Sequence, residues 1–299
     1  MKSNHRQTIR HALCAALLAA ASVMAPTHAT DAPAPNMPNT HAIPADLAEQ
    51  VRRSEFIGRL LFVLDWAAAV GTDVMHANLS ADERSHLSGY LTVVDEKEGD
   101  APVTQTTYFF TRDRQPRIAC SVTVGYQMKP VFKRYEPTAL PSLALAQLFE
   151  ARQSALKALS PPQQPLNPIA LPAAMFGEEG TVVYALAGTS KPNVAVFGKH
   201  YRVLVAPDNT TITSIMPMTK GIMEIPMRPP QGNEPVAIGV TQVLTDYPTE
   251  TQVFTNRMIG IPVDVATGRG LWQIVEGRIS FVQTAQEMEA AGKDGTGKP

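Results

Sequence analysis

A single carboxylate interrupts the most apolar stretch of the chain and is the first candidate for chemistry. Asp65 stands within residues 56–70, where nearly every other side chain is apolar. Burying a carboxylate costs several kcal/mol unless it is paired or hydrogen-bonded, so Asp65 needs a partner or a function. If the segment is a regular helix, His76 falls within about 20° of Asp65 around the axis and Asp73 about 80° away. An aspartate and a histidine on one face are residue types of an acid–base or metal site.

Three readings of Asp65 stay open. It makes a structural hydrogen bond or ion pair, it belongs to a catalytic or metal-binding site, or its face of the helix lies at the surface. The structural partner is expected to be a backbone amide, a hydroxyl or an arginine such as Arg59. In that case Asp65 is mostly buried. Asp65→Ala then lowers the free energy of unfolding by about 1–3 kcal/mol, because the partner loses its hydrogen bond.

The other candidates are single residues. His200 begins a strand-like run, where a lone histidine is more often structural than catalytic. Cys120 lies in an alternating strand pattern, which predicts a buried small hydrophobic residue. The sequence has no phosphate-binding glycine loop, no His-Glu-x-x-His and no Cys or His pair at zinc spacing, so we expect no cofactor and no metal. The catalytic candidates are Asp65, Asp73, His76 and His200.

Helices and strands predicted from the sequence pattern have to position these residues. A helix is expected over 47–70, with Asp46 as its cap and Gly71 as a point of interruption. A second helix is expected over 141–159. The strand-like runs are 90–95, 104–111, 117–125, 181–187, 201–206, 211–216, 236–244, 252–257, 262–266, 271–275 and 279–282.

The order of these elements predicts an α+β protein. Short, turn-rich links between the strands predict antiparallel sheets. We expect N-terminal helices with a small antiparallel sheet, followed by a mainly antiparallel β lobe. The expected divisions are a signal peptide (1–29), a flexible leader (30–46), an N-terminal α+β lobe (47–159), a Pro-rich linker or loop (160–168), a C-terminal β lobe (169–284) and a disordered tail (285–299).

The first 29 residues predict export. They contain a positive segment, an apolar run over 12–25 and a small-residue cleavage site that ends at Ala29. The run is shorter than the roughly 20 residues that a membrane span needs. We therefore expect a soluble periplasmic or secreted protein, with no membrane span after signal cleavage.

The composition of the expected exported chain bears on its charged partners and on its disulfide bonds. Cleavage after Ala29 removes three of the 26 basic residues and none of the 27 acidic ones, which leaves a net charge of −4. Without a long basic run, nucleic acid is not an expected partner. Cys14 leaves with the signal peptide, so Cys120 has no cysteine with which to form an internal disulfide.

Several stretches resemble a group of uncharacterised secreted bacterial proteins with no established activity. They are residues 59–73, 183–191, 200–203, 249–255 and 271–272. Because these stretches spread over most of the exported chain, the resemblance implies one evolutionary unit. It supplies no catalytic residue.

The functional expectation is a non-catalytic envelope protein that binds an unknown protein or envelope ligand. Export, the missing catalytic motifs and β-rich edges that can add a partner's strand all favour it. The alternative is a hydrolase whose site is assembled from distant residues, among them Asp65, Asp73 and His76.

Overall fold

The computed structural model describes residues 40–98, 101–125, 127–160, 165–188, 191, 194–226 and 237–294. The side chains of residues 96–98, 101–102 and 291–294 are outside this description. The expected signal peptide and most of the expected leader lie outside the described residues. Contacts divide the chain into two compact units. Unit 1 comprises Met1–Arg59, Thr189–Lys199 and Met218–Pro299, and unit 2 comprises Leu60–Gly188 and His200–Pro217.

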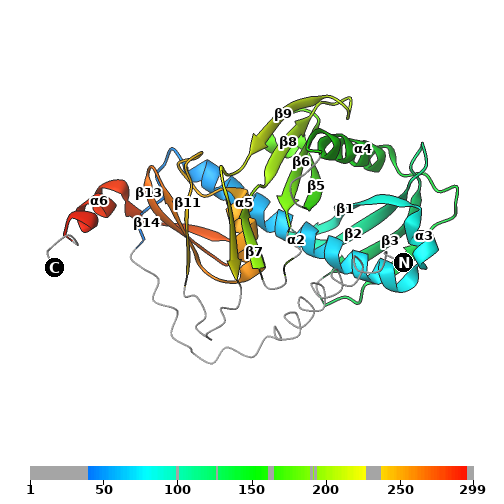
Figure 1. Ribbon diagram of the computed structural model, residues 1–299, viewed down its shortest axis with the longest axis horizontal. Helices are drawn as coiled ribbons and strands as arrows, with labels where there is room; N and C mark the ends of the chain where they lie inside the picture. Colours follow the sequence, from blue (N-terminus) through cyan, green and yellow to red (C-terminus); the bar gives the residue numbers. More distant parts are fainter. Residues whose placement is uncertain are drawn as a thin grey trace, which may run out of the picture. The chain divides into compact units, whose positions relative to one another are not determined.

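One long helix contributes residues to both units. Helix α2 (Ala48–Asn78) has 31 residues, eight more at its C-terminal end than the sequence predicted (Figure 1). Gly71 does not interrupt it, and its role is to let Thr107 approach. A Cβ at position 71 would lie 2.9 Å from Thr107 Cβ, and Thr107 Oγ1 donates to Ala67 O at 3.2 Å.

By length and composition, α2 is the one helix of the described chain that is able to cross a membrane. The central helix of a water-soluble protein meets the same criterion. The buried side chains of α2 belong to the cores of the units: Val51 packs in unit 1, and Ala67 and Met75 pack in unit 2.

The first sheet of unit 2 is antiparallel, with its strands in sequence order. It consists of β1 (Leu87–Glu98), β2 (Ala101–Thr111), β3 (Ile118–Gly125) and β4 (Val131–Arg134), and it follows the short helix α3 (Ala81–Ser85). Successive strand residues point to opposite faces. Phe109 accordingly packs with α2 side chains, and Phe110 packs with Phe149 of α4 (Leu143–Ala158) at 4.0 Å between ring centroids.

The second sheet of unit 2 has the strand order β5-β6-β8-β9 and is also antiparallel. Its strands are β5 (Leu166–Pro172), β6 (Thr181–Ala187), β8 (Tyr201–Val205) and β9 (Ile212–Pro217), with the 3-10 helix η1 (Ala173–Phe176) after β5. Helix α4 packs against this sheet (Figure 1). Leu91, Phe149 and Val183 share one core, which joins both sheets and α4.

Unit 1 contains a four-stranded sheet of order β11-β12-β13-β14. Its strands are β11 (Ile238–Thr241), β12 (Val263–Thr267), β13 (Gly270–Val275) and β14 (Arg278–Thr284), and only β11 and β12 are parallel. A two-stranded sheet pairs β7 (Val194–Gly198) with β10 (Ile222–Pro226), and the helices are α5 (Glu250–Ile259) and α6 (Ala285–Asp294). Val253, Phe197 and Trp272 lie in its core.

The α+β class is confirmed, whereas the predicted lobe boundaries are wrong. The units interleave along the chain, since β5, β6, β8 and β9 join the N-terminal elements through the shared core with α4. The expected linker over 160–168 does not separate the units. Strand β5 begins within it at Leu166, and residues 161–164 are outside the described chain.

Two local predictions are also wrong. The expected strand over 252–257 is helix α5, because Thr249 and Gln252 form a capping box and Gly260 ends the helix with a φ of 68°. The expected disordered tail begins with α6, where Glu287 Oε2 accepts from Thr284 N at 2.8 Å and so caps the first turn. Residues 295–299 lie outside the description.

Cys120 is a free thiol with no exposed surface, as its strand pattern predicted. Burial raises its pKa to about 12. The thiol is therefore protonated at neutral pH and packs as an apolar side chain.

Candidate functional site

Asp65 lies in unit 2 beside residues from other elements of that unit. It is half-buried, and its Oδ1 accepts from Asn167 Nδ2 of β5 at 3.4 Å, which is a long hydrogen bond. Tyr90 of β1 is close enough that the charge on Asp65 contributes to raising the pKa of the phenol, after the larger effect of burial. The suggested partner Arg59 binds Glu55 and Gly277 O in unit 1 and so is not the partner.

Hydrogen bonding offsets only part of the cost of burying the Asp65 carboxylate. Burial raises its pKa to about 6, and the hydrogen bond from Asn167 lowers the pKa by a smaller amount. A carboxyl that titrates near neutral pH both takes up and releases a proton under ordinary conditions. The observed partner of Asp65 is a side-chain amide, and not the backbone amide, hydroxyl or arginine that the structural reading expected.

Arg152 of α4 is the buried cation beside Tyr90. It is 4% exposed, and its Cζ lies 4.7 Å from the centroid of the Tyr90 ring. Its Nη1 donates to Gln153 Oε1 at 3.0 Å, while Nε has no hydrogen-bond partner in the described chain. Gly89 leaves room for this guanidinium, because a Cβ there would lie 3.1 Å from Arg152 Nη1.

We call Asp65, Tyr90, Arg152 and Asn167 the Asp65 cluster. The four side chains come from α2, β1, α4 and β5, so the cluster is assembled by the fold of unit 2. It combines a proton-exchanging carboxyl with a guanidinium that is able to stabilise negative charge. This is the chemistry of a small acid–base or anion-binding site.

Asp73 and His76 are not part of the cluster. The rise of 1.5 Å per residue places His76 about 16 Å from Asp65 along α2, although the two share a face. His76 is exposed and Asp73 is half-buried. The structure therefore does not bring these three candidates together.

His200 has a structural role in unit 2. Its side chain is 2% exposed, and Nδ1 accepts from the backbone N–H of Ala187 at 2.9 Å. An accepting Nδ1 requires the proton to be on Nε2. The bond ties the start of β8 to the end of β6, as the structural reading of a strand-end histidine predicts.

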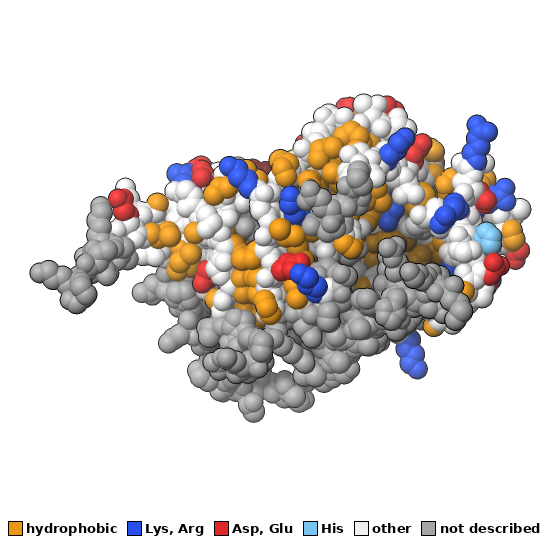
Figure 2. Space-filling model, in the orientation of Figure 1, with side chains coloured by type: hydrophobic (Ala, Val, Ile, Leu, Met, Phe, Trp, Pro, Cys, Tyr) orange, Lys and Arg blue, Asp and Glu red, His pale blue; other side chains and the backbone are white. Residues whose placement is uncertain are grey.

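Strand β9 is an edge strand with an exposed, uncharged surface. It pairs with β8, and its other edge has no strand partner in the part of the chain that the structure describes. Five of its six residues are exposed, including Ile215 at 43% and Met216 at 45%. Figure 2 shows hydrophobic side chains at the surface in the region where Figure 1 draws β8 and β9. Natural edge strands usually carry charges that prevent further pairing, and Ile212–Pro217 has none.

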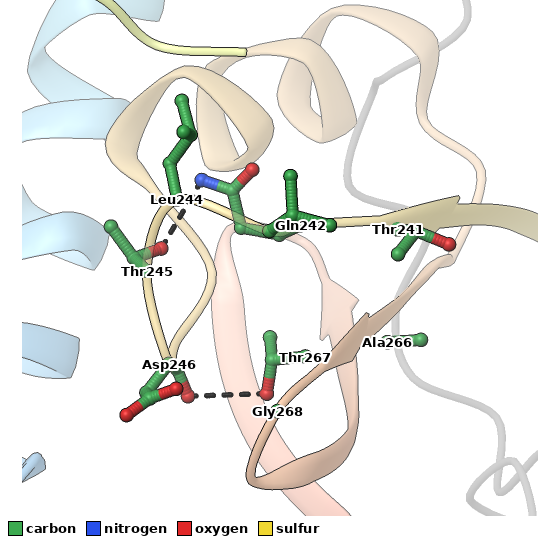
Figure 3. Close-up of a pocket in the computed structure, with 9 residues that line it drawn as sticks. Thr241, Gln242, Leu244, Thr245, Asp246, Ala266, Thr267 and Gly268 are labelled. Atoms are coloured by element: carbon green, nitrogen blue, oxygen red, sulfur yellow. Dashed lines mark hydrogen bonds between the residues drawn. The ribbon is translucent and has the colours of Figure 1, made fainter. Parts of the chain in front are cut away.

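Unit 1 carries an open hollow of about 580 Å³ between the segment after β11 and the β12–β13 turn (Figure 3). Its polar lining groups bind one another: Gln242 Nε2 donates to Thr245 Oγ1 at 3.1 Å, and Thr267 Oγ1 donates to Asp246 O at 3.2 Å. These hydrogen bonds hold the segment after β11 and the β12–β13 turn in place at the edge of the hollow. The residues that line the hollow do not form a catalytic set.

Thr267→Val is expected to lower the free energy of unfolding by about 2 kcal/mol. Thr267 Oγ1 accepts from Nε1 of the fully buried Trp272 at 3.0 Å, and valine would leave that N–H without a partner. Urea denaturation measures the loss. Thr267→Ser keeps the hydroxyl and is expected to retain most of the stability. Equal losses in the two variants would show that the hydroxyl does not matter.

No family model, curated protein or solved structure matches the chain. The resemblance to uncharacterised secreted bacterial proteins therefore stays a prediction.

The sequence predicted Asp65 and missed the residues around it. Arg152 had a readable signal, because it falls on the apolar stripe of α4 between Phe149 and Leu156. A charged residue on such a stripe needs a partner, as Asp65 does. Tyr90 and Asn167 had no such signal in the sequence, because only the tertiary fold brings β1 and β5 to α2.

Proposed function

We propose that this protein is an exported, non-catalytic binding protein of the cell envelope, and that β9 accepts an extended segment of a partner protein. The observation that carries the proposal is the open edge of β9, which is uncharged and exposes Ile215 and Met216. In strand addition, backbone hydrogen bonds supply affinity and alternate side chains supply specificity. Ile215 and Met216 are adjacent, so they offer one apolar contact on each face of the sheet.

The chemistry of the edge specifies the partner segment. Because Ile212–Pro217 contains no charged residue, it offers no ion pair to a charged strand. The fitting segment is extended, apolar at alternate positions and uncharged. We propose that the encounter takes place in the periplasm or outside the cell, because residues 1–29 have the sequence pattern of a secretory signal peptide. We expect neither nucleic acid as a partner nor a membrane span in the exported form.

Site-specific photo-crosslinking in the cells that make the protein tests this proposal. A photoreactive residue at the exposed Ser214 of β9 is expected to give a discrete crosslinked complex, and one at the exposed Arg114 of unit 2 is not.

Met216→Lys is expected to abolish the complex, since an edge charge opposes strand addition. Met216 is 45% exposed, so the variant is expected to fold normally. A crosslink at Ser214 that survives Met216→Lys, or none above the Arg114 control, contradicts the proposal.

Hydrolysis is a second candidate function, and the Asp65 cluster favours it. The Asp65 carboxyl has a pKa of about 6, and the buried guanidinium of Arg152 lies over the ring of Tyr90, on which the charge of Asp65 also acts. The carboxyl is suited to activate water and the guanidinium to stabilise an anion. Chromogenic ester, phosphate and glycoside substrates test it. Turnover of one of them that falls by about a hundredfold in Asp65→Asn, with the fold intact, would favour hydrolysis over binding alone.

A further inference from the structure

The open hollow of unit 1 lies where two parallel strands end. Strands β11 and β12 run in the same direction, and the hollow is lined by the segment that follows β11, the end of β12 and the turn after it (Figure 3). Its volume of about 580 Å³ is in the range of small-molecule sites. Because the hollow is open to solvent, a ligand enters it without a rearrangement of the fold.

Asp246 gives the hollow a negative charge. It is the only charged side chain among the described residues that line the hollow. Its backbone is fixed by Thr267, whose Oγ1 donates to Asp246 O at 3.2 Å. Arg269, the cation of the adjoining turn, forms its ion pair with Asp46. Within the described chain, the Asp246 carboxylate therefore has neither a hydrogen-bond donor nor a cation as a partner.

Three of the polar side chains in the lining use their donors inside the protein. Gln242 Nε2 donates to Thr245 Oγ1 at 3.1 Å, and the Thr245 hydroxyl donates to Tyr247 O at 2.6 Å. The Thr267 hydroxyl donates to Asp246 O. The Asp246 carboxylate, which only accepts hydrogen bonds, is left for a ligand. The hollow thus favours a ligand that donates hydrogen bonds and carries a positive charge.

Gly268 keeps space open beside this carboxylate. A Cβ at position 268 would lie 3.2 Å from Asp246 Oδ1 and would meet no other described atom within 4 Å. The φ of Gly268 lies outside the left-handed region, so its backbone conformation does not require glycine. The missing side chain therefore leaves room for a ligand atom next to the carboxylate oxygen.

The apolar part of the lining is aliphatic. Val243 is 61% exposed and Leu244 is 43% exposed on the segment after β11. Ala266, at the end of β12, also lines the hollow. An alkyl chain that covers these side chains removes apolar surface from water on both partners, which favours binding.

We propose that this hollow binds the ammonium group of an alkylamine, with the charge at Asp246 and the alkyl chain against Val243 and Leu244. An ammonium group has three donors and no acceptor, which complements a carboxylate beside donors that are already in use. The amine is a free soluble molecule or the side chain of a lysine. The lining belongs to unit 1 and β9 belongs to unit 2, so this proposal and the proposed function stand independently.

An NMR titration of the exported chain with pentylamine tests the site. The amides of residues 241–246 and 266–268 are expected to shift in a saturable manner. Pentanol has the same alkyl chain without the charge and is expected to leave these amides unshifted at the same concentrations.

Two variants test the carboxylate and the space beside it separately. Asp246→Asn removes the charge, and Gly268→Ala keeps the charge but fills the space, so each is expected to weaken pentylamine binding by about tenfold or more. Both residues are exposed, and a thermal melt verifies that the variants fold. Asp113→Asn, at an exposed position in unit 2, is the matched control and is expected to leave the affinity unchanged.

A peptide distinguishes the two sources of the amine. Tighter binding of acetyl-Gly-Lys-Gly-amide than of pentylamine assigns the site to a lysine side chain, and tighter binding of pentylamine assigns it to a soluble amine. The proposal is overturned if pentylamine shifts none of the lining amides, if pentanol shifts them equally, or if both folded variants bind as wild type does.

Discussion

Asn256→Ala is expected to lower the free energy of unfolding by about 3 kcal/mol. The side chain of Asn256 is 2% exposed and makes three hydrogen bonds in unit 1. Its Nδ2 donates to Ile261 O at 2.9 Å and to Ile274 O at 3.0 Å, and its Oδ1 accepts from Gly277 N at 2.8 Å. Alanine would leave all three backbone groups without this partner, at a cost of about 1–3 kcal/mol for each one that stays buried and unpaired.

Urea denaturation of two matched variants checks this value. Asn78→Ala removes an exposed side chain whose Nδ2 donates to Val74 O within α2, and it is expected to change stability by less than about 0.5 kcal/mol. Asn256→Asp keeps an acceptor for Gly277 N but turns a carboxylate toward two carbonyl oxygens, so it is expected to be as harmful as alanine at neutral pH. If Asn256→Ala costs no more than Asn78→Ala, Asn256 does not hold α5 to β13.

Asp65→Asn is expected to stabilise the protein at neutral pH by about 1–2 kcal/mol. The pKa of Asp65 rises from 3.8 to about 6 on folding, so the folded state binds more protons within that interval. The contribution of Asp65 to stability is therefore full below pH 3.8 and is lost as pH rises through about 6. The whole shift corresponds to about 3 kcal/mol, and we expect less because the side chain is half-buried.

Unfolding free energies near pH 4 and near pH 7.5 measure this effect. The advantage of Asp65→Asn over wild type is expected to appear only at the higher pH, while Asp113→Asn, an exposed position in the β2–β3 link, shows no such change. Destabilisation at both pH values would restore the well-paired carboxylate that the sequence suggested. A carboxyl that costs stability at neutral pH is typical of a functional position, which is why the Asp65 cluster merits the substrate assays.

Helix α5 shows where local patterns mislead. Val253, Phe254 and Thr255 favour a strand by propensity, yet the capping box before them and Gly260 after them set a helix. The capping residues and Gly260 are stronger local signals than the strand propensity of the residues between them. Most strands of both units were predicted because their alternation and turn-rich links are local features.

Long-range pairing explains what the sequence did not predict. Among the described residues, strands β7 and β10 pair only with each other, and β9 belongs to a sheet that begins with β5. No short stretch of sequence reveals these pairings. The Asp65 cluster depends on the same kind of placement. Asp65 was identified because burial penalises a lone carboxylate in an apolar helix, but Asn167 lies about a hundred residues further on.

Amide hydrogen exchange at β9 tests the central claim most directly. The measurement compares the amides of residues 212–216 in the isolated protein and in the complex purified through the Ser214 crosslink. Strand addition adds backbone hydrogen bonds along the free edge of β9, so we predict slower exchange at these amides in the complex and unchanged exchange in β4, an edge strand of the other sheet of unit 2. Amides 212–216 that exchange equally fast in both samples would contradict the claim that β9 accepts a partner strand.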